Sequence, residues 1–323
     1  MPSDLLEVRH LNVTYHTPAG PICAVRDLSL TLNSGGTLAI VGETGCGKST
    51  LALSLIGLLD SQGCHQSGQI FFEGRDLAIL TQREWRQVRG SKIGMVFQDP
   101  RNALNPVLNV GAQLVETLRA HQKISKRAAR EKALCILSEV GVPDPPLFMR
   151  RFPSQLSGGL CQRVGIALAI CHEPVLLIAD EPTSALDPTI QAQILALLEK
   201  MKQQHRLALL LISHDLALVS MVATHVAVMY GGHLVESGVA NEVFARPAHP
   251  YTQALLVCLP TLEHQRDHNP LRPIPGAPVW TDENFAGCVF APRCPRAIIE
   301  CQSSEPNNRA LSESHWVACI RAE

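Results

Sequence analysis

One stretch of the chain has the residue types and the spacing that suit the binding of a nucleotide triphosphate. It follows the phosphate-loop (P-loop) pattern G-x-x-x-x-G-K-[ST] and reads Gly42, Glu43, Thr44, Gly45, Cys46, Gly47, Lys48, Ser49, Thr50. Glycines let backbone N–H groups approach the phosphates, and a helix that begins there adds its free amides and the positive end of its dipole. Lys48 would reach the β- and γ-phosphate oxygens, and the Ser49 hydroxyl would hold Mg²⁺.

The residues around this motif have the pattern that a P-loop requires. The apolar run at 37–41 predicts a buried strand before it, and residues 49–59 predict a helix after it. A glycine-rich turn before an ordinary helix is the alternative interpretation of the motif alone. The strand–loop–helix order favours a P-loop and an α/β fold of the P-loop NTPase class.

Polar residues follow three further apolar runs, each of which predicts a buried strand. Gln98 follows 93–97, Asp180 and Glu181 follow 175–179, and His214 follows 207–212. In an open parallel α/β sheet, ligands bind at the carboxyl ends of the strands. Asp180 could hold Mg²⁺ through its water shell, and Glu181 could polarise a water. Gln98 could reach Mg²⁺ or that water, and His214 could donate to a γ-phosphate, although either residue alone could be structural.

Two other sites have both a binding and a structural interpretation. Ser157, Gly158 and Gly159 precede an apolar helix at 164–170, where they could bind a second anion or simply cap the helix. Tyr15 ends the first predicted strand, where its ring could stack on adenine or only pack on its neighbours.

Composition excludes several classes of protein. Lys and Arg number 28 against 29 Asp and Glu, so no general affinity for nucleic acid is expected. The first residues lack a basic segment leading into an apolar run, which argues against a secretory signal. No run approaches 18 apolar residues, so no membrane span is expected. The eleven cysteines are then expected to be thiols or metal ligands in a reducing compartment.

The pattern divides the chain into two expected domains. A nucleotide-binding domain covers 1–245, with antiparallel strands over 6–32 and a helical subdomain at about 100–172. Prolines recur after about residue 245 and break any long element. We therefore expect 246–323 to form an appended region of loops and short helices.

The motifs in this order resemble the nucleotide-binding subunits of ABC transporters. Gln98 matches the Q-loop, 156–159 the signature, Asp180 and Glu181 the Walker B end, 184–187 the D-loop with Asp187, and His214 the switch histidine. Tyr15 stands at the position of the A-loop aromatic. The resemblance implies that two domains pair head to tail, with ATP between the P-loop of one and Ser157-Gly158-Gly159 of the other. It assigns Glu181, His214, Gln98 and Lys48 to catalysis, and Ser49, Gln98 and Asp180 to Mg²⁺.

The C-terminal region narrows the resemblance to ATPases of dipeptide, oligopeptide and nickel importers. The segments at 249–256, 287–290 and 292–295 carry it, and the dipeptide-type D subunit is most similar. The partners implied are a second related ATPase, two permease subunits that contact about 100–150, and a periplasmic or lipoprotein substrate-binding protein. The chain would lie on the cytoplasmic face of the bacterial inner membrane. Leu160 departs from the usual Gln or Met of the signature. The first three signature residues supply most of the phosphate contact in the family, so we expect activity to survive; a weakened partner's site is the alternative.

Other functions remain open at this point. Nickel chelate or haem could replace peptide as the substrate. An ABC ATPase outside transport is one alternative, but such proteins usually have a second ATPase domain or a basic surface for nucleic acid. An iron- or redox-sensing ATPase is another, with the cysteines of the C-terminal region as its sensor.

Two sets of cysteines invite chemical hypotheses. Cys288, Cys294, Cys301 and Cys319 are good metal ligands by type, and similar regions in the family imply a [4Fe–4S] cluster; zinc or no metal are the alternatives from spacing. Cys46 lies at a helix N-terminus beside Lys48, where the pKa of a thiol should fall. We expect alkylation of Cys46 to block ATP binding and ATP to protect it; an inert small residue is the alternative.

Overall fold

The computed structural model describes residues 4–60, 62–184, 186–258, 273–277 and 285–322. Within this part, the chain forms two compact units. We call the first the P-loop unit, which comprises residues 4–32, 37–78 and 213–323. The second is the helical unit, which comprises residues 33–36 and 79–212.

The P-loop unit begins with an antiparallel sheet in the strand order β2-β1-β4-β5. Its strands are β1 (Asp4–Thr17), β2 (Gly20–Asn33), β4 (Cys64–Phe72) and β5 (Arg75–Asp76). Strands β1 and β4 pair from Leu6 with Phe72 to Tyr15 with Cys64. Buried and exposed side chains alternate over parts of β1 and β2, which is the sequence pattern that predicted antiparallel strands here.

A second set of strands in the P-loop unit leads directly to the P-loop. Their order is β11-β12-β10-β9-β3, with β3 (Thr37–Val41), β9 (His225–Tyr230) and β10 (His233–Val239) next to one another. Every residue of β3 is buried, and it runs parallel to β9. The described helices of this unit include α1 (Lys48–Leu55), α9 (Leu216–Ser220), α10 (Ala240–Ala245) and α11 (Pro250–Val257).

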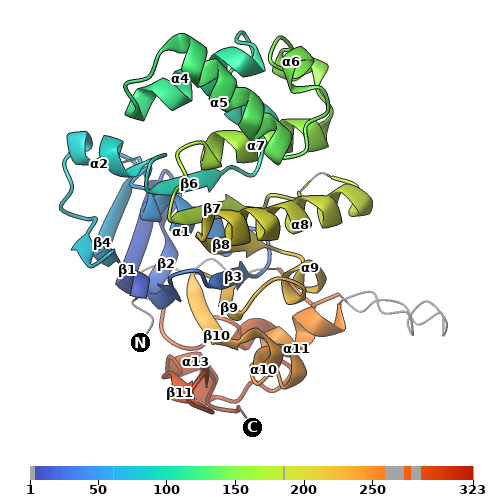
Figure 1. Cartoon of the computed structure of the whole chain (residues 1–323). Helices are drawn as coiled ribbons and strands as arrows, with labels where there is room; N and C mark the ends of the chain where they lie inside the picture. Colours follow the sequence, from blue (N-terminus) through green and yellow to red (C-terminus); the bar gives the residue numbers. More distant parts are fainter. Residues whose placement is uncertain (1–3, 61, 185, 259–272, 278–284, 323) are drawn as a thin grey trace, which may run out of the picture. The chain divides into compact units, whose positions relative to one another are not determined.

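The helical unit contains three buried parallel strands in the order β8-β7-β6. They are β6 (Ile93–Val96), β7 (Leu176–Asp180) and β8 (Ala208–Ser213). Helix α7 lies between β6 and the group formed by α4 and α5 (Figure 1). The helices of this unit are α2 (Gln82–Val88), α3 (Pro100–Ala103), α4 (Val110–His121), α5 (Lys126–Glu139), α6 (Pro145–Phe148), α7 (Gly158–Ile170) and α8 (Pro188–His205), with the 3₁₀ turn η1 (Pro153–Gln155).

The C-terminal region contains strands that the sequence did not predict. Strand β12 (His315–Val317) pairs with β10, and β11 (Arg309–Ala310) pairs with β12. These strands are only two and three residues long, so they give no alternating pattern in the sequence. Besides α11, the described part of this region contains the 3₁₀ turn η2 (Ala291–Arg293) and the one-turn helix α13 (Glu300–Ser303).

Candidate functional site

The P-loop joins β3 to α1 through glycines in conformations that other residues rarely adopt. Gly45 and Gly47 have φ of 85° and 104°. A Cβ on Gly42 would lie 2.1 Å from the carbonyl oxygen of Met229, and one on Gly47 would lie 2.0 Å from that of Ala24. These contacts require glycine at both positions, because a side chain would collide with the backbone.

Lys48 lies inside this loop. Its side chain is buried, and Nζ donates to the carbonyl oxygens of Gly42 at 2.8 Å and Glu43 at 2.9 Å. Thr44 and Gly45 at the tip of the loop are exposed. Ser49 and Thr50 are in the first turn of α1, next to the helix amides. The loop therefore combines a buried cation with accessible backbone, as an anion site requires.

Tyr15 contacts the helix that the P-loop begins. Its hydroxyl lies 3.3 Å from Oγ1 of Thr50, 35 residues further along the chain. The tyrosine is thus a neighbour of the P-loop rather than only the end of a strand. His214, which also belongs to the P-loop unit, is exposed immediately after β8.

The helical unit holds the predicted water-activating group. Nε2 of Gln98 donates to Oε2 of Glu181 at 3.0 Å, so two predicted site residues 83 positions apart are in contact. Glu181 has φ of 44°, in the left-handed region that a non-glycine residue rarely occupies. Asp180, the last residue of β7, and Glu181 are both buried. Backbone strain of this kind is often found at functional sites.

The residues after Glu181 support its position. Oγ of Ser184 donates to the carbonyl oxygens of Glu181 at 2.9 Å and Gln98 at 3.2 Å. Asp187 caps α8 by accepting from N–H of Ile190. Ala185, the second residue of the predicted D-loop, lies outside the described residues.

The signature loop begins α7. Ser157 is exposed, and its Oγ accepts from N–H of Leu160 at 3.4 Å, so it is the helix cap that the structural interpretation predicted. A Cβ on Gly158 would lie 3.2 Å from Leu186, and one on Gly159 would lie 2.8 Å from Ile190. The glycines therefore allow the side chains of Leu186 and Ile190 to approach the start of α7 closely. The cap interpretation does not exclude anion binding, because the cap satisfies only one of the free amides at a helix N-terminus.

The pKa expected for Cys46 is wrong in direction. Burial raises the pKa of this thiol, and the nearby Lys48 lowers it by less. The sequence could not reveal how completely the fold encloses the side chain. That labelling of Cys46 would block ATP binding stays a prediction.

The predicted [4Fe–4S] cluster is also wrong. Among the described residues, no group of three or more His, Cys, Asp or Glu side chains is arranged to hold a metal ion. Cys288, Cys294, Cys301 and Cys319 border one cavity of about 10 Å³, roughly enough for one water. Burial raises the pKa of Cys288 to about 11 and also raises those of Cys294 and Cys319.

Two residues of the C-terminal region contact the P-loop, and neither was predicted to have a role at this site. The Tyr251 hydroxyl accepts from the backbone N–H of Glu43 at 2.8 Å. Arg293 forms an ion pair with the Glu43 carboxylate, with the shortest N–O distance at 2.6 Å. Both belong to segments that carried the family resemblance, which was the available signal. Nothing local to either residue indicates its partner.

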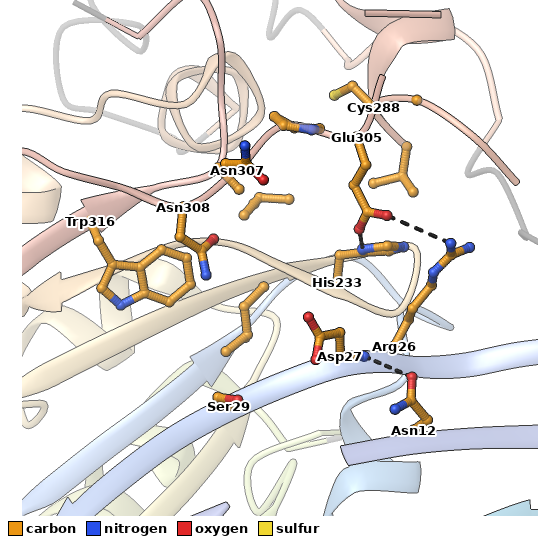
Figure 2. Close-up of a pocket in the computed structure, with 16 residues that line it drawn as sticks. Asn12, Arg26, Asp27, Ser29, His233, Cys288, Glu305, Asn307, Asn308 and Trp316 are labelled. Atoms are coloured by element: carbon orange, nitrogen blue, oxygen red, sulfur yellow. Dashed lines mark hydrogen bonds and ion pairs between the residues drawn. The ribbon is translucent and has the colours of Figure 1, made fainter. Parts of the chain in front are cut away.

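A polar pocket of about 440 Å³ lies in the P-loop unit. Figure 2 shows Glu305 directed at His233 and Arg26 in this pocket. The Glu305 carboxylate is 3.1 Å from Nδ1 of His233 and 3.6 Å from Nη2 of Arg26. The hydrogen bond with His233 holds the pKa of Glu305 below its usual range. Of the predicted site residues, the pocket includes only Cys288.

Comparison with known proteins identifies the family. Residues 25–184 match the family described as ABC transporter, and residues 235–301 match the oligopeptide/dipeptide transporter C-terminal region. The chain is 46% identical to the dipeptide transport ATP-binding protein DppD of Bacillus subtilis (strain 168), with 98% of this chain and 94% of that protein covered. The chain belongs to the ABC transporter ATPases. This confirms the family and the fold class predicted from the motifs.

Other relatives of this ABC ATPase support the same family. It is 44% identical to the oligopeptide transport ATP-binding protein OppD of Bacillus subtilis (strain 168), over 97% of this chain and 87% of that protein. The dimeric ATP-binding cassette MJ0796 bound to ADP and Pi is a similar solved structure, with a TM-score of 0.66 and 26% identity over 73% of this chain and 98% of that one. Within the described residues, no helix of the ABC ATPase has the length and apolar character to span a membrane.

Proposed function

We propose that this chain is the ATP-hydrolysing subunit of an importer for dipeptides and oligopeptides. The observation that carries the proposal is similarity over nearly the whole chain, including the C-terminal region, to ATP-binding proteins named for dipeptide and oligopeptide transport.

The P-loop unit binds ATP. Backbone amides of 42–48 and the amides of the first turn of α1 surround the phosphates, and Lys48 supplies the positive charge. The Tyr15 ring stacks on adenine, held there through its contact with Thr50. Ser49, Gln98 and Asp180 are the residues that would hold Mg²⁺, which neutralises charge on the phosphates when bound.

Glu181 orients the attacking water and takes up its proton. Its hydrogen bond with Gln98 fixes the carboxylate, and its backbone is in the left-handed conformation directly after β7. Removing such a base typically costs about 10²–10⁴-fold in rate. His214 donates to the γ-phosphate as charge develops there.

Hydrolysis requires a second, related ATPase chain. Ser157, Gly158 and Gly159 of one chain meet the ATP held by the P-loop of the other, and the exposed helix start suits that contact. ATP then favours the closed pair because it binds both surfaces at once. Leu160 offers no hydrogen bond to the partner, so the first three signature residues carry the contact.

The permease subunits bind the helical unit. A hollow of about 760 Å³ lies along α4 and α5 and is lined in part by Arg119, Lys126, Arg130 and Arg150. This surface falls in the region that the sequence assigned to permease contact, and its basic groups would suit acidic segments of a membrane partner. The subunit would thus lie at the cytoplasmic face of the bacterial inner membrane, and a separate binding protein would deliver the substrate.

Uptake measurements test the proposal. A strain lacking this gene is complemented with wild type or with Lys48→Ala, and uptake of a labelled dipeptide, a labelled tetrapeptide, a nickel chelate and haem is measured. We expect wild type alone to restore peptide uptake, with nickel and haem unchanged. Restored nickel or haem uptake without peptide uptake would contradict the proposed substrate, and full peptide uptake by Lys48→Ala would contradict the proposed use of ATP.

A further inference from the structure

Arg293, in the C-terminal region, has its entire hydrogen-bonding capacity used at the P-loop. Its two terminal nitrogens donate to the two carboxylate oxygens of Glu43 at 2.6 and 3.1 Å. The remaining N–H groups donate to the Tyr230 hydroxyl and to the carbonyl oxygens of Ile274 and Pro275, at 2.8 to 3.3 Å. All five N–H donors of the guanidinium therefore have an acceptor. A lysine has only three donors and cannot form the paired contact with a carboxylate.

Glu43 is held at every polar group, not only at its side chain. Its N–H donates to the Tyr251 hydroxyl at 2.8 Å, and its carbonyl oxygen accepts from Nζ of Lys48 at 2.9 Å. The two peptide planes that flank Glu43 are therefore fixed from outside the loop and from inside it. These planes begin the row of amides that faces the phosphates.

The residues that hold Glu43 belong to a rigid base. The rings of Tyr230, Tyr251 and Phe290 pack together with centroids 4.6 to 5.3 Å apart, and all three are buried. The helix that carries Tyr251 is fixed at its start, because the buried Glu236 carboxylate accepts from N–H of Ala248 and of His249.

Nε2 of His315, at the start of β12, lies 2.8 Å from the Glu236 carboxylate, so the C-terminal strand joins the same base. The Glu236 carboxylate thus has three hydrogen-bond partners, and a buried group paired in this way stiffens its surroundings.

A second contact of the C-terminal region reaches the other side of the loop. Glu305 pairs with His233, as Figure 2 shows. Gly232, the residue before His233, donates its N–H to the carbonyl oxygen of Cys46 at 3.1 Å. The loop is thus held at Glu43 and at Cys46 by the C-terminal region and the turn that it contacts.

We propose that Arg293 is a positioning residue for ATP, which holds Glu43 so that the P-loop amides are arranged before the phosphates arrive. This rests on the proposed role of the P-loop as the phosphate site of ATP. A loop ordered in advance avoids the cost of ordering on binding, so losing the contact weakens ATP affinity and leaves the chemical step largely intact. An ion pair that only anchors the C-terminal region would instead change stability and not ATP affinity.

The test measures binding of a fluorescent ATP analogue (mant-ATP) and the KM and kcat of ATP hydrolysis, using the full chain for binding and the assembled importer for hydrolysis. The variants are Arg293→Lys, Glu43→Gln and their combination. Arg309→Met is the matched control, because Arg309 is an exposed arginine of the same region that bonds Ala322 within it. Lys48→Ala reports on the P-loop itself.

We expect each single variant to raise Kd and KM about tenfold with kcat changed less than about twofold. The Kd of the combined variant should lie within about twofold of that of the weaker-binding single variant, because both substitutions remove the same contact. Arg309→Met should match wild type.

Wild-type Kd in both single variants, with binding lost in Lys48→Ala, would overturn the role of Arg293 alone. Wild-type Kd in Lys48→Ala would overturn the P-loop assignment and the inference with it. If Arg293→Lys loses its thermal unfolding transition, Glu43→Gln decides, because that change lies on a partly exposed loop and leaves the base of the C-terminal region intact.

Discussion

The P-loop and the signature loop both begin a helix with glycine, yet they are held in different ways. The P-loop is enclosed by backbone of β9 and β2 and contacted by Tyr251 and Arg293, which follow it by more than 200 residues. The signature loop depends on its own cap at Ser157 and on nearby Leu186 and Ile190. Under the proposed function, the P-loop binds ATP within its own chain and benefits from a fixed shape, whereas the signature loop meets another chain and must stay exposed.

Changing the signature should separate binding from hydrolysis. In Gly158→Ala, the added Cβ would lie 3.2 Å from the Leu186 side chain and crowd the start of α7. The ATPase rate of the assembled importer should then fall about 100-fold. Binding of ATP by the isolated chain should stay within about twofold of wild type, because the P-loop is untouched. A loss of ATP binding by the isolated chain would mean that the two loops are not independent.

Removing one hydroxyl should reveal how firmly the P-loop is held. In Tyr251→Phe, N–H of Glu43 loses its acceptor in a partly buried position, which should lower the free energy of unfolding by about 1–3 kcal/mol. Chemical denaturation measures this difference, with Tyr15→Phe as the control because that hydroxyl contacts only a side chain at the helix surface. Equal losses of unfolding free energy in both variants would show that the contact with Glu43 stabilises the fold no more than the contact with Thr50 does.

The enclosure of the P-loop should also slow the reaction of the Cys46 thiol with alkylating reagents. Because burial holds the pKa of Cys46 above the usual value, its thiolate is scarce at neutral pH. Iodoacetamide at about pH 7.5 should label exposed Cys135 at least about tenfold faster. Raising the pH should speed the labelling of Cys46, which should then block ATP binding and be prevented by ATP. Equal labelling rates at pH 7.5 would contradict the enclosure.

The smallest effect is expected at Glu305. Its pKa is lowered in the folded protein, so its ion pair stabilises above the usual pKa of about 4.3 and is lost as the pH falls through the lowered value. Glu305→Gln should lower Tm by less than about 3 °C at pH 7, because the pair is partly exposed. The difference from wild type should shrink as the pH falls and be lost below the lowered pKa of Glu305. A difference that persists there would mean that packing, not charge, explains it.

The sequence predicted what is local and missed what is distant. The P-loop, the strands that end at Gln98 and Asp180, and the cap at Ser157 follow from motifs and periodicity over a few residues. The contact between Arg293 and Glu43 spans 250 positions, and no local pattern encodes it. The same limit explains the errors: the pKa of Cys46 depends on burial, and the geometry of the four C-terminal thiols depends on how loops without periodicity fold.

One measurement decides whether ATP binding and water activation depend on different residues of this chain. Wild type and Glu181→Gln are compared in the assembled importer for ATP Kd and for single-turnover hydrolysis. We predict a Kd within about twofold of wild type and a hydrolysis rate about 10²–10⁴-fold lower, because the amide cannot take up the proton of water. Hydrolysis near the wild-type rate would contradict the assignment of Glu181 and of the hydrogen bond with Gln98 that positions it.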